Sequence, residues 1–238
     1  MPAVAFGHDW LTSSARYSGL LEHLASWGIV AAAPNTERGI APSVLNLAFD
    51  MGTALDIVTG VRLGPGKISV HPSKLGLVGH GLGGAAAVFA AAGMPRKPKT
   101  IAAIFPAITN PTAELPGTTL AVPGVIFSAP KDRTSLLSNA VSLSQAWKSA
   151  TLRVVSHAEP HGLAEGRHFG KALGLPNSHR KTHQAVRTLL TGYLLGVLND
   201  DKAYREFADP KVQLPGTDAV TPDANPASIE DKIVALLK

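Results

Sequence analysis

Short apolar runs alternate with helix-like segments along most of this chain of 238 residues. Such alternation is typical of a mostly parallel sheet with helices on both faces, which is an α/β fold. We expect strands at 2–6, 29–33, 75–78, 100–105, 122–128 and 152–156. We expect helices at 17–27, 43–58, from 83 onward, and at 138–147 and 182–198. The helix at 17–27 shows the clearest amphipathic period and is followed by Gly28, a typical C-terminal cap.

One domain covering residues 1–210 accounts for this pattern, and its length allows a substantial core. The segment 211–238 differs in composition. Its first part, 212–226, holds three prolines and few apolar residues, which predicts a linker. Residues 228–231 then resemble a capping box that opens a short amphipathic helix. That helix either packs on its own domain or binds a partner.

Composition excludes several classes of function. The formal net charge is +5, but the basic residues are scattered and aromatic residues make up only 5%. A nucleic-acid surface would need a basic stripe with interleaved aromatic residues, so we expect no nucleic-acid partner. The chain has no cysteine, which excludes disulfides, thiol catalysis and thiolate metal sites.

The sequence contains no targeting or membrane signal. Residues 1–6 lack the basic and long apolar regions of a signal peptide. No apolar run approaches the ~18 residues that a membrane span needs. If the chain is complete, these features predict a cytoplasmic protein.

The segment Gly79-His80-Gly81-Leu82-Gly83-Gly84 carries the most specific functional pattern. It lies between an apolar run and a run of small residues, which is the strand–turn–helix context of a nucleophile elbow, G-x-S-x-G. Gly79, His80 and Gly83 fit the pattern, but Gly81 stands where the serine nucleophile should be. We expect His80 to be a buried, hydrogen-bonded structural residue.

An acid and a base candidate follow the elbow in the chain order of a Ser-His-Asp hydrolase. Asp132 follows the strand at 122–128, and active-site residues of parallel sheets lie at such strand ends. The alternative for Asp132 is an ordinary turn aspartate. His161 follows the strand at 152–156 and is the preferred base, with His157 as its rival.

The backbone N–H of Leu82 is the expected oxyanion donor, together with one N–H from the loop 8–11. Trp10 in that loop offers a flat wall to a substrate, or simply covers the core. The sequence thus predicts binding of a small ester or acyl ligand, without a cofactor.

Several segments together resemble the dienelactone hydrolases, and especially the polyester-hydrolase, cutinase-like esterases. The similar segments are Trp10, Leu24-Ala25-Ser26-Trp27-Gly28-Ile29-Val30, Lys74–His80, Pro123–Phe127 and Leu198–Phe207. The resemblance covers about residues 3–210 and implies an α/β-hydrolase fold with a Ser-His-Asp esterase site. The family's leading antiparallel strands and its cysteines have no counterpart here.

Two departures from the family concern the chemistry. Gly81 has no hydroxyl, so no acyl-enzyme can form there. The pair His8-Asp9 places a carboxylate near the oxyanion site, where negative charge is unfavourable. The sequence therefore favours a catalytically impaired pseudoenzyme.

Three alternatives stay open at this point. The old cleft could bind a ligand or partner without catalysis. Ser128 or Ser156 could be a relocated nucleophile, since each ends a strand. A metal could be held by His157, His161 and His168 with Glu159 and Glu165, although their spacing matches no known metal motif.

Overall fold

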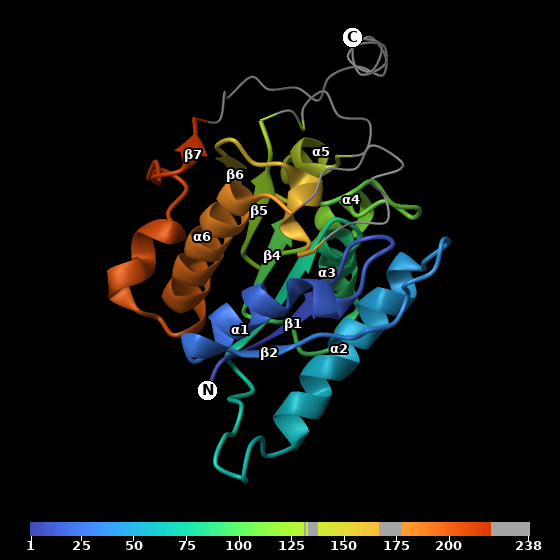
Figure 1. The fold of residues 1–238 in the computed structure, drawn as a ribbon, viewed down its shortest axis with the longest axis vertical. Helices are drawn as coiled ribbons and strands as arrows, with labels where there is room; N and C mark the ends of the chain where they lie inside the picture. Colours follow the sequence, from blue (N-terminus) through green and yellow to red (C-terminus); the bar gives the residue numbers. More distant parts are fainter. Residues whose placement is uncertain (131, 133–137, 167–177, 220–238) are drawn as a thin grey trace.

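A seven-stranded, mostly parallel sheet forms the centre of the computed structural model (Figure 1). The structure describes residues 1–130, 132, 138–166 and 178–219. The strand order is β2-β1-β3-β4-β5-β6-β7, and only β7 runs antiparallel to its neighbour. The strands are β1 (Ala3–Gly7), β2 (Val30–Ala32), β3 (Leu75–His80), β4 (Thr100–Ile104), β5 (Gly124–Ser128), β6 (Ala150–Val155) and β7 (Thr217–Asp218). The prediction of a mostly parallel α/β sheet is confirmed.

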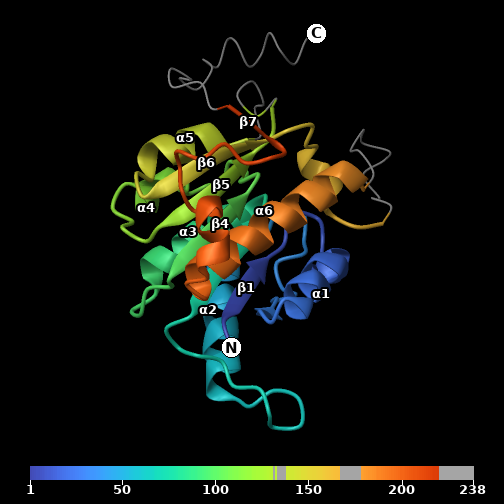
Figure 2. The same ribbon diagram turned by 90° about the vertical axis from the view of Figure 1, so that its left-hand side faces the viewer.

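Helices cover both faces of this sheet (Figure 2). One face packs against α2 (Val44–Gly60), α3 (Leu82–Gly93) and α5 (Ala140–Ala146), and the short helix α4 (Glu114–Gly117) lies against α3 and α5. The other face packs against α1 (Ser18–Ser26) and α6 (Arg180–Leu198). Short 3₁₀ helices occur at η1 (Ser14–Tyr17), η2 (Pro160–Leu163) and η4 (Lys202–Phe207).

Alternate side chains of each central strand enter different halves of the core. In β1, Ala3 and Ala5 pack with α2 and α3, whereas Val4 and Phe6 pack with α1 and α6. Successive side chains of a strand point to opposite faces, and both faces here are covered. This explains why the strands are continuous apolar runs and do not alternate with polar residues.

The parallel strands bring their carboxyl ends to one edge of the sheet. Within that edge, β1 and β3 are neighbours, but β1 leads to β2 on one side and β3 leads to β4 on the other. Open α/β sheets usually bind their ligands near such a reversal of strand order. The loop after β1 and the turn after β3 meet at this point.

The predicted elements match the observed ones within a few residues, but several short elements were not expected. The strand predicted at 75–78 continues to His80, and the helix predicted from 83 begins at Leu82. The helix α4 and the 3₁₀ turns are too short to show a period. The predicted helix at 228–237 lies outside the described residues.

The prediction of a linker from residue 211 did not anticipate β7. Two residues of that segment, Thr217 and Asp218, pair with β6 and extend the sheet. The guanidinium of Arg153 in β6 donates to the carbonyl oxygens of Asp209 and Val212 and holds the segment that leads to β7. A two-residue strand has no alternation that a sequence pattern could reveal.

None of the helices in the described ranges combines the length and apolar character needed to cross a membrane.

The turn between β3 and α3 packs against β1 at backbone distance. A Cβ at Gly83 would lie 2.1 Å from the carbonyl oxygen of Gly7, and one at Gly79 would lie 1.9 Å from the carbonyl oxygen of Gly83. Both distances are far below van der Waals contact, and the blocking atoms belong to the backbone. Glycine at these positions is therefore a packing requirement.

Replacing Gly83 by alanine should lower the free energy of unfolding by about 1–3 kcal/mol or more, since overpacking forces the backbone apart. Gly93, at the end of the same helix, is the matched control because a Cβ there meets nothing within 4 Å. Gly93→Ala should leave stability unchanged or raise it by up to about 1 kcal/mol. Urea unfolding followed by circular dichroism measures both, and equal effects would contradict the packing argument.

Candidate functional site

Gly81 forms the turn between β3 and α3 with φ 55° and ψ −115°. A positive φ of this kind is strained for a residue with a side chain and easy for glycine. The Gly81 N–H donates to the carbonyl oxygen of Ile104 in β4, at 3.0 Å. The Gly81 carbonyl oxygen accepts from Ala107 at 3.1 Å. The predicted strand–turn–helix around Gly81 is confirmed.

The carboxylate of Asp9 occupies the space above this turn. Its Oδ1 accepts a hydrogen bond from the backbone N–H of Leu82, at 2.9 Å. An ideal Cβ at position 81 would lie 1.9 Å from the same Oδ1 and 2.2 Å from Cγ of Asp9. The carboxylate therefore fills the volume where the side chain of an elbow residue would stand, and it uses the N–H of the expected oxyanion donor.

The side chains of His8 and Tyr17 hold the backbone of the loop that carries Asp9. The imidazole of His8 is fully buried, and its two nitrogens lie 2.9 Å from the carbonyl oxygen of Asp9 and 2.7 Å from that of Thr36. A neutral imidazole has one N–H and can donate to only one of these oxygens. The Asp9 N–H donates to the hydroxyl of Tyr17 at 3.2 Å. Asp9 is thus held by its own backbone as well as by Leu82.

His80 is a structural residue, as predicted from the motif. It is 1% exposed, and its Nδ1 lies 2.8 Å from the Tyr17 hydroxyl. If that hydroxyl accepts from Asp9, it donates to Nδ1, and the imidazole proton is then on Nε2. Burial is the main cause that raises the pKa of Tyr17 far above its ordinary value, so the hydroxyl keeps its proton. His80 Nδ1 is 4.0 Å from Oδ2 of Asp9.

Asp132 lies just beyond the carboxyl end of β5 and is 5% exposed. Its Oδ2 accepts from the Ala129 N–H at 2.7 Å. Burial raises the pKa of Asp132 to about 6, while the bond from Ala129, the Ser138 hydroxyl and the charge of His161 each lower it. The carboxyl group is therefore ionised at neutral pH and near enough to His161 to sense its charge.

His161 lies on the 3₁₀ turn η2, which follows β6, and is partly exposed. Hydrogen bonds with residues at the start of α6 hold this turn in place. The Glu159 N–H donates to the Thr182 hydroxyl at 2.9 Å, and the His179 N–H donates to the Gly162 carbonyl oxygen at 2.8 Å. The rival His157 is exposed and has φ 55°. The interaction with Asp132 favours His161 over His157 as the partner of the acid.

Trp10 lies beside Asp9 and is 48% exposed. Its indole N–H donates to the Ile40 carbonyl oxygen at 2.8 Å, which fixes the ring against the loop before α2. A half-exposed ring at this point is available as a wall for a ligand and is not part of the core.

The geometry of Ser128 and Ser156 does not favour either as a relocated nucleophile. Ser128 is 1% exposed, and its Oγ has no hydrogen-bond partner among the described residues. Ser156 Oγ donates to Asp218 at 2.5 Å and so faces the sheet edge at β7. Neither hydroxyl contacts a histidine in the described structure. The described residues also contain no cluster of three metal-ligating side chains, and His168 lies outside them.

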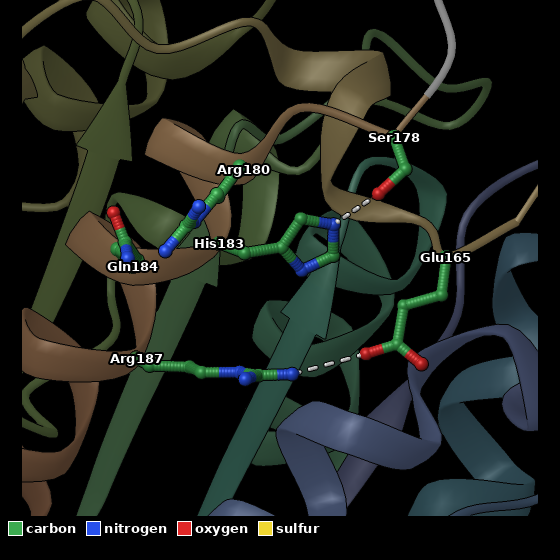
Figure 3. A pocket seen from close by; sticks show the side chains of 6 residues that line it. All are labelled: Glu165, Ser178, Arg180, His183, Gln184 and Arg187. Carbon is green, nitrogen blue, oxygen red and sulfur yellow. Dashed lines mark hydrogen bonds and ion pairs between the residues drawn. The ribbon is translucent and has the colours of Figure 1, made fainter.

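Apart from the turn at Gly81, a pocket of about 340 Å³ lies at the start of α6 (Figure 3). Its lining residues come from α6 and from the segments on either side of the undescribed 167–177: Glu165, Ser178, Arg180, His183, Gln184 and Arg187. Sequence analysis missed this pocket, although four of these residues repeat at helical spacing on one face of α6. Only the fold could add Glu165 and Ser178 to them.

Two contacts organise this pocket. The carboxylate of Glu165 accepts from Arg187 at 3.2 Å and from the Gly19 N–H at 3.1 Å, so it joins α6 to the start of α1. His183 Nε2 lies 2.9 Å from the Ser178 hydroxyl. Burial is the main cause that lowers the pKa of His183, which favours the neutral ring at neutral pH. The positive charge of the pocket therefore comes from Arg180 and Arg187.

Comparison with protein-family models and with curated proteins finds no match to this chain. The chemistry of the site therefore rests on its own geometry.

The stability of the protein should depend on the ionisation of Asp132. Its folded-state pKa of about 6 lies above the ordinary value of 3.8, so the folded state holds a proton that the unfolded state releases between these values. Stability should therefore fall as pH rises from about 4 to about 6, by roughly 3 kcal/mol from this group.

Asp132→Asn removes the titration while keeping an oxygen for the Ala129 N–H. Urea unfolding at several pH values should show the variant gaining stability relative to the unmodified protein across this range. Parallel pH profiles for the two proteins would show that Asp132 is not buried as described.

Proposed function

We propose that this chain has an α/β-hydrolase fold, is related to the carboxylic-ester hydrolases, and lacks their serine-based acyl transfer. The observation that carries the proposal is the Asp9 carboxylate on the Leu82 N–H, above a turn at Gly81 that has no side chain. The proposal accounts both for the hydrolase-like arrangement and for the missing nucleophile.

The positions of the other groups support the hydrolase part of the proposal. The turn at Gly81, the acid Asp132 and the base His161 follow β3, β5 and β6 in the order of the Ser-His-Asp hydrolases. All three strands are parallel, so these residues lie at the same edge of the sheet. The charge of His161 is also one of the causes that lower the pKa of Asp132, as is expected of a base near its acid.

Two independent features oppose acyl transfer. Without an Oγ at position 81 no acyl-enzyme can form. In addition, a tetrahedral oxyanion would need the Leu82 N–H, which already binds a negative oxygen of Asp9. Restoring only the serine would therefore leave the oxyanion site blocked.

Binding of a small anion in the pocket at the start of α6 is a second candidate function. Two guanidinium groups and a single carboxylate line this pocket, and Nε of Arg187 is buried with no hydrogen-bond partner in the described structure. A ligand carboxylate would match this donor set.

Gly81→Ser alone should not hydrolyse p-nitrophenyl acetate above background, because its Cβ collides with Asp9 and the oxyanion donor stays engaged. Gly81→Ser combined with Asp9→Gly should show activity, measured as release of p-nitrophenol. Adding His161→Gln to the double variant should reduce that activity by about 100-fold or more, since the serine then lacks its base. An inactive but folded double variant would contradict the proposal, and so would fluorophosphonate labelling of the unmodified chain.

Butyrate should raise the midpoint of thermal unfolding in a concentration-dependent manner, because it binds only the folded pocket. Butyramide has nearly the same shape without the charge and should have little effect. Arg180→Gln should abolish the shift with butyrate without breaking the Arg187–Glu165 pair. Equal shifts with butyrate and butyramide would exclude anion recognition.

A further inference from the structure

The helix α2 carries apolar side chains on two opposite faces. Its inner face packs in the core through a set of buried side chains: Val44, Leu47, Ala48, Met51, Leu55 and Val58. Its outer face carries an apolar residue or a threonine at every fourth position, which together we call the exposed α2 row: Leu45, Phe49, Thr53, Ile57 and Val61. A helix that is apolar around most of its circumference is normally covered on all sides.

The exposed α2 row faces solvent along its whole length. The exposed fractions of its apolar members are 49% for Leu45, 76% for Phe49, 58% for Ile57 and 45% for Val61. The helix lies at the periphery of the molecule, and its C-terminal part extends beyond the sheet (Figures 1 and 2). The Thr53 hydroxyl donates to the Phe49 carbonyl oxygen at 3.1 Å, so burial of Thr53 would leave no unpaired donor. Single exposed apolar residues are ordinary, but a contiguous patch marks an interaction surface.

We propose that the exposed α2 row binds a second copy of this chain about a two-fold axis near Thr53. A two-fold interface is isologous, so if residue i contacts residue j of the partner, j also contacts i. The row meets this condition because positions equally distant from Thr53 are both apolar: Phe49 with Ile57, and Leu45 with Val61. When two copies lie antiparallel, Phe49 of one is level with Ile57 of the other. This association does not depend on the chemistry at Gly81.

The spacing of the row suits the packing of one helix on another. Residues four apart form a ridge inclined by ~26° to the helix axis, and helices pack most often through such ridges, at ~50° to each other. This crossing places Phe49 and Ile57 beside the centre and Leu45 and Val61 at the margins. Thr53, the smallest residue of the row, lies at the centre and allows a close approach of the two helices.

The area of the row also fits a two-fold dimer. An aromatic side chain offers ~150–250 Å² and an aliphatic one somewhat less, so the four apolar side chains expose roughly 400 Å² per copy. A standard interface buries ~800 Å² per partner, of which a little over half is apolar. The row therefore supplies about the apolar share that a dimer of standard size needs.

The charges of α2 do not suit the alternative of a lipid surface. Interfacial helices carry Lys and Arg beside their apolar face, whereas the charged residues of α2 are Asp50 and Asp56. At 3.6 residues per turn these two carboxylates lie on opposite flanks of the row, so neither lies at the centre of the dimer.

Sedimentation velocity over a range of protein concentrations reads the association directly. At micromolar concentrations the unmodified chain should change from a particle of 24.7 kDa to one of twice that mass. Phe49→Glu should weaken the association by about 30-fold or more, as expected of a central interface residue. Leu115→Glu is the matched control, because Leu115 on α4 is 68% exposed, and it should leave the association unchanged. Circular dichroism checks that each variant is folded.

A mixing experiment tests the antiparallel pairing. Phe49→Glu and Ile57→Lys should each be monomeric, because each homodimer would place two charges against apolar side chains. Mixed together, they should form a heterodimer. In it the introduced glutamate is level with the introduced lysine, and the native Ile57 of one copy is level with the native Phe49 of the other. A parallel arrangement would bring neither pair together.

Cross-linking tests the position of the axis without adding a charge. The chain has no cysteine, so Thr53→Cys introduces a single thiol at the proposed axis, and mild oxidation should give a disulfide-linked dimer. Leu45→Cys is the matched control on the same helix. Its thiols in two antiparallel copies are ~24 Å apart along α2 and cannot form a disulfide.

An unmodified chain that stays monomeric at micromolar concentrations would overturn the proposal, and so would a dimer that persists in folded Phe49→Glu. Failure of the two charged variants to associate on mixing, or equal cross-linking of Leu45→Cys and Thr53→Cys, would also overturn it. Flotation of the monomer with phosphatidylcholine vesicles, without self-association, would assign the row to a lipid surface instead.

Discussion

The hydrogen bond from the Leu82 N–H to Oδ1 of Asp9 is the interaction on which the site depends. It joins the loop after β1 to the start of α3 across the point where the strand order reverses. Every other feature of the centre is consistent with it: Gly81 leaves room for the carboxylate, and Tyr17 and His8 hold the backbone that carries it. A carboxylate here also interacts favourably with the positive end of the α3 dipole.

This arrangement separates two tasks that a serine elbow combines. In a serine hydrolase, the turn residue presents the nucleophile and the next N–H stabilises the oxyanion. Here the turn supplies only the N–H, and the carboxylate that binds it comes from the loop after the neighbouring strand β1. The close contacts of Gly79 and Gly83 with backbone carbonyl oxygens keep the turn in the geometry that makes this possible.

The fold was largely predictable because its signals are local. Burial on both faces of the sheet produces strands that are continuous apolar runs. Burial on one face produces the amphipathic period of α1. Both patterns can be recognised in the sequence. The elbow, Asp132 and His161 could be located because the carboxyl ends of parallel strands share one edge. The sequence also indicated that Asp9 lies near the oxyanion site.

The contacts that define the chemistry were not predictable. Nothing in the sequence indicates that Asp9 accepts from Leu82 and fills the space of the missing side chain, since that depends on how two loops pack. The role of Tyr17, which links Asp9 to His80, and that of Glu165, which links α1 to α6, are equally non-local. The strand β7 could not be predicted from the sequence, because two residues are too few to show an alternating pattern.

The anchoring of η2 has a mechanical consequence for His161. Its turn is tied to Thr182 and His179 at the start of α6, and Glu165 ties the following segment to α1 and α6. The imidazole therefore moves with the helical layer, whereas Gly81 and Asp9 directly follow the strands β3 and β1. The distance from His161 to Gly81 and Asp9 is thus a distance between two layers, and any sliding of α6 over the sheet changes it while leaving the turn at Gly81 intact.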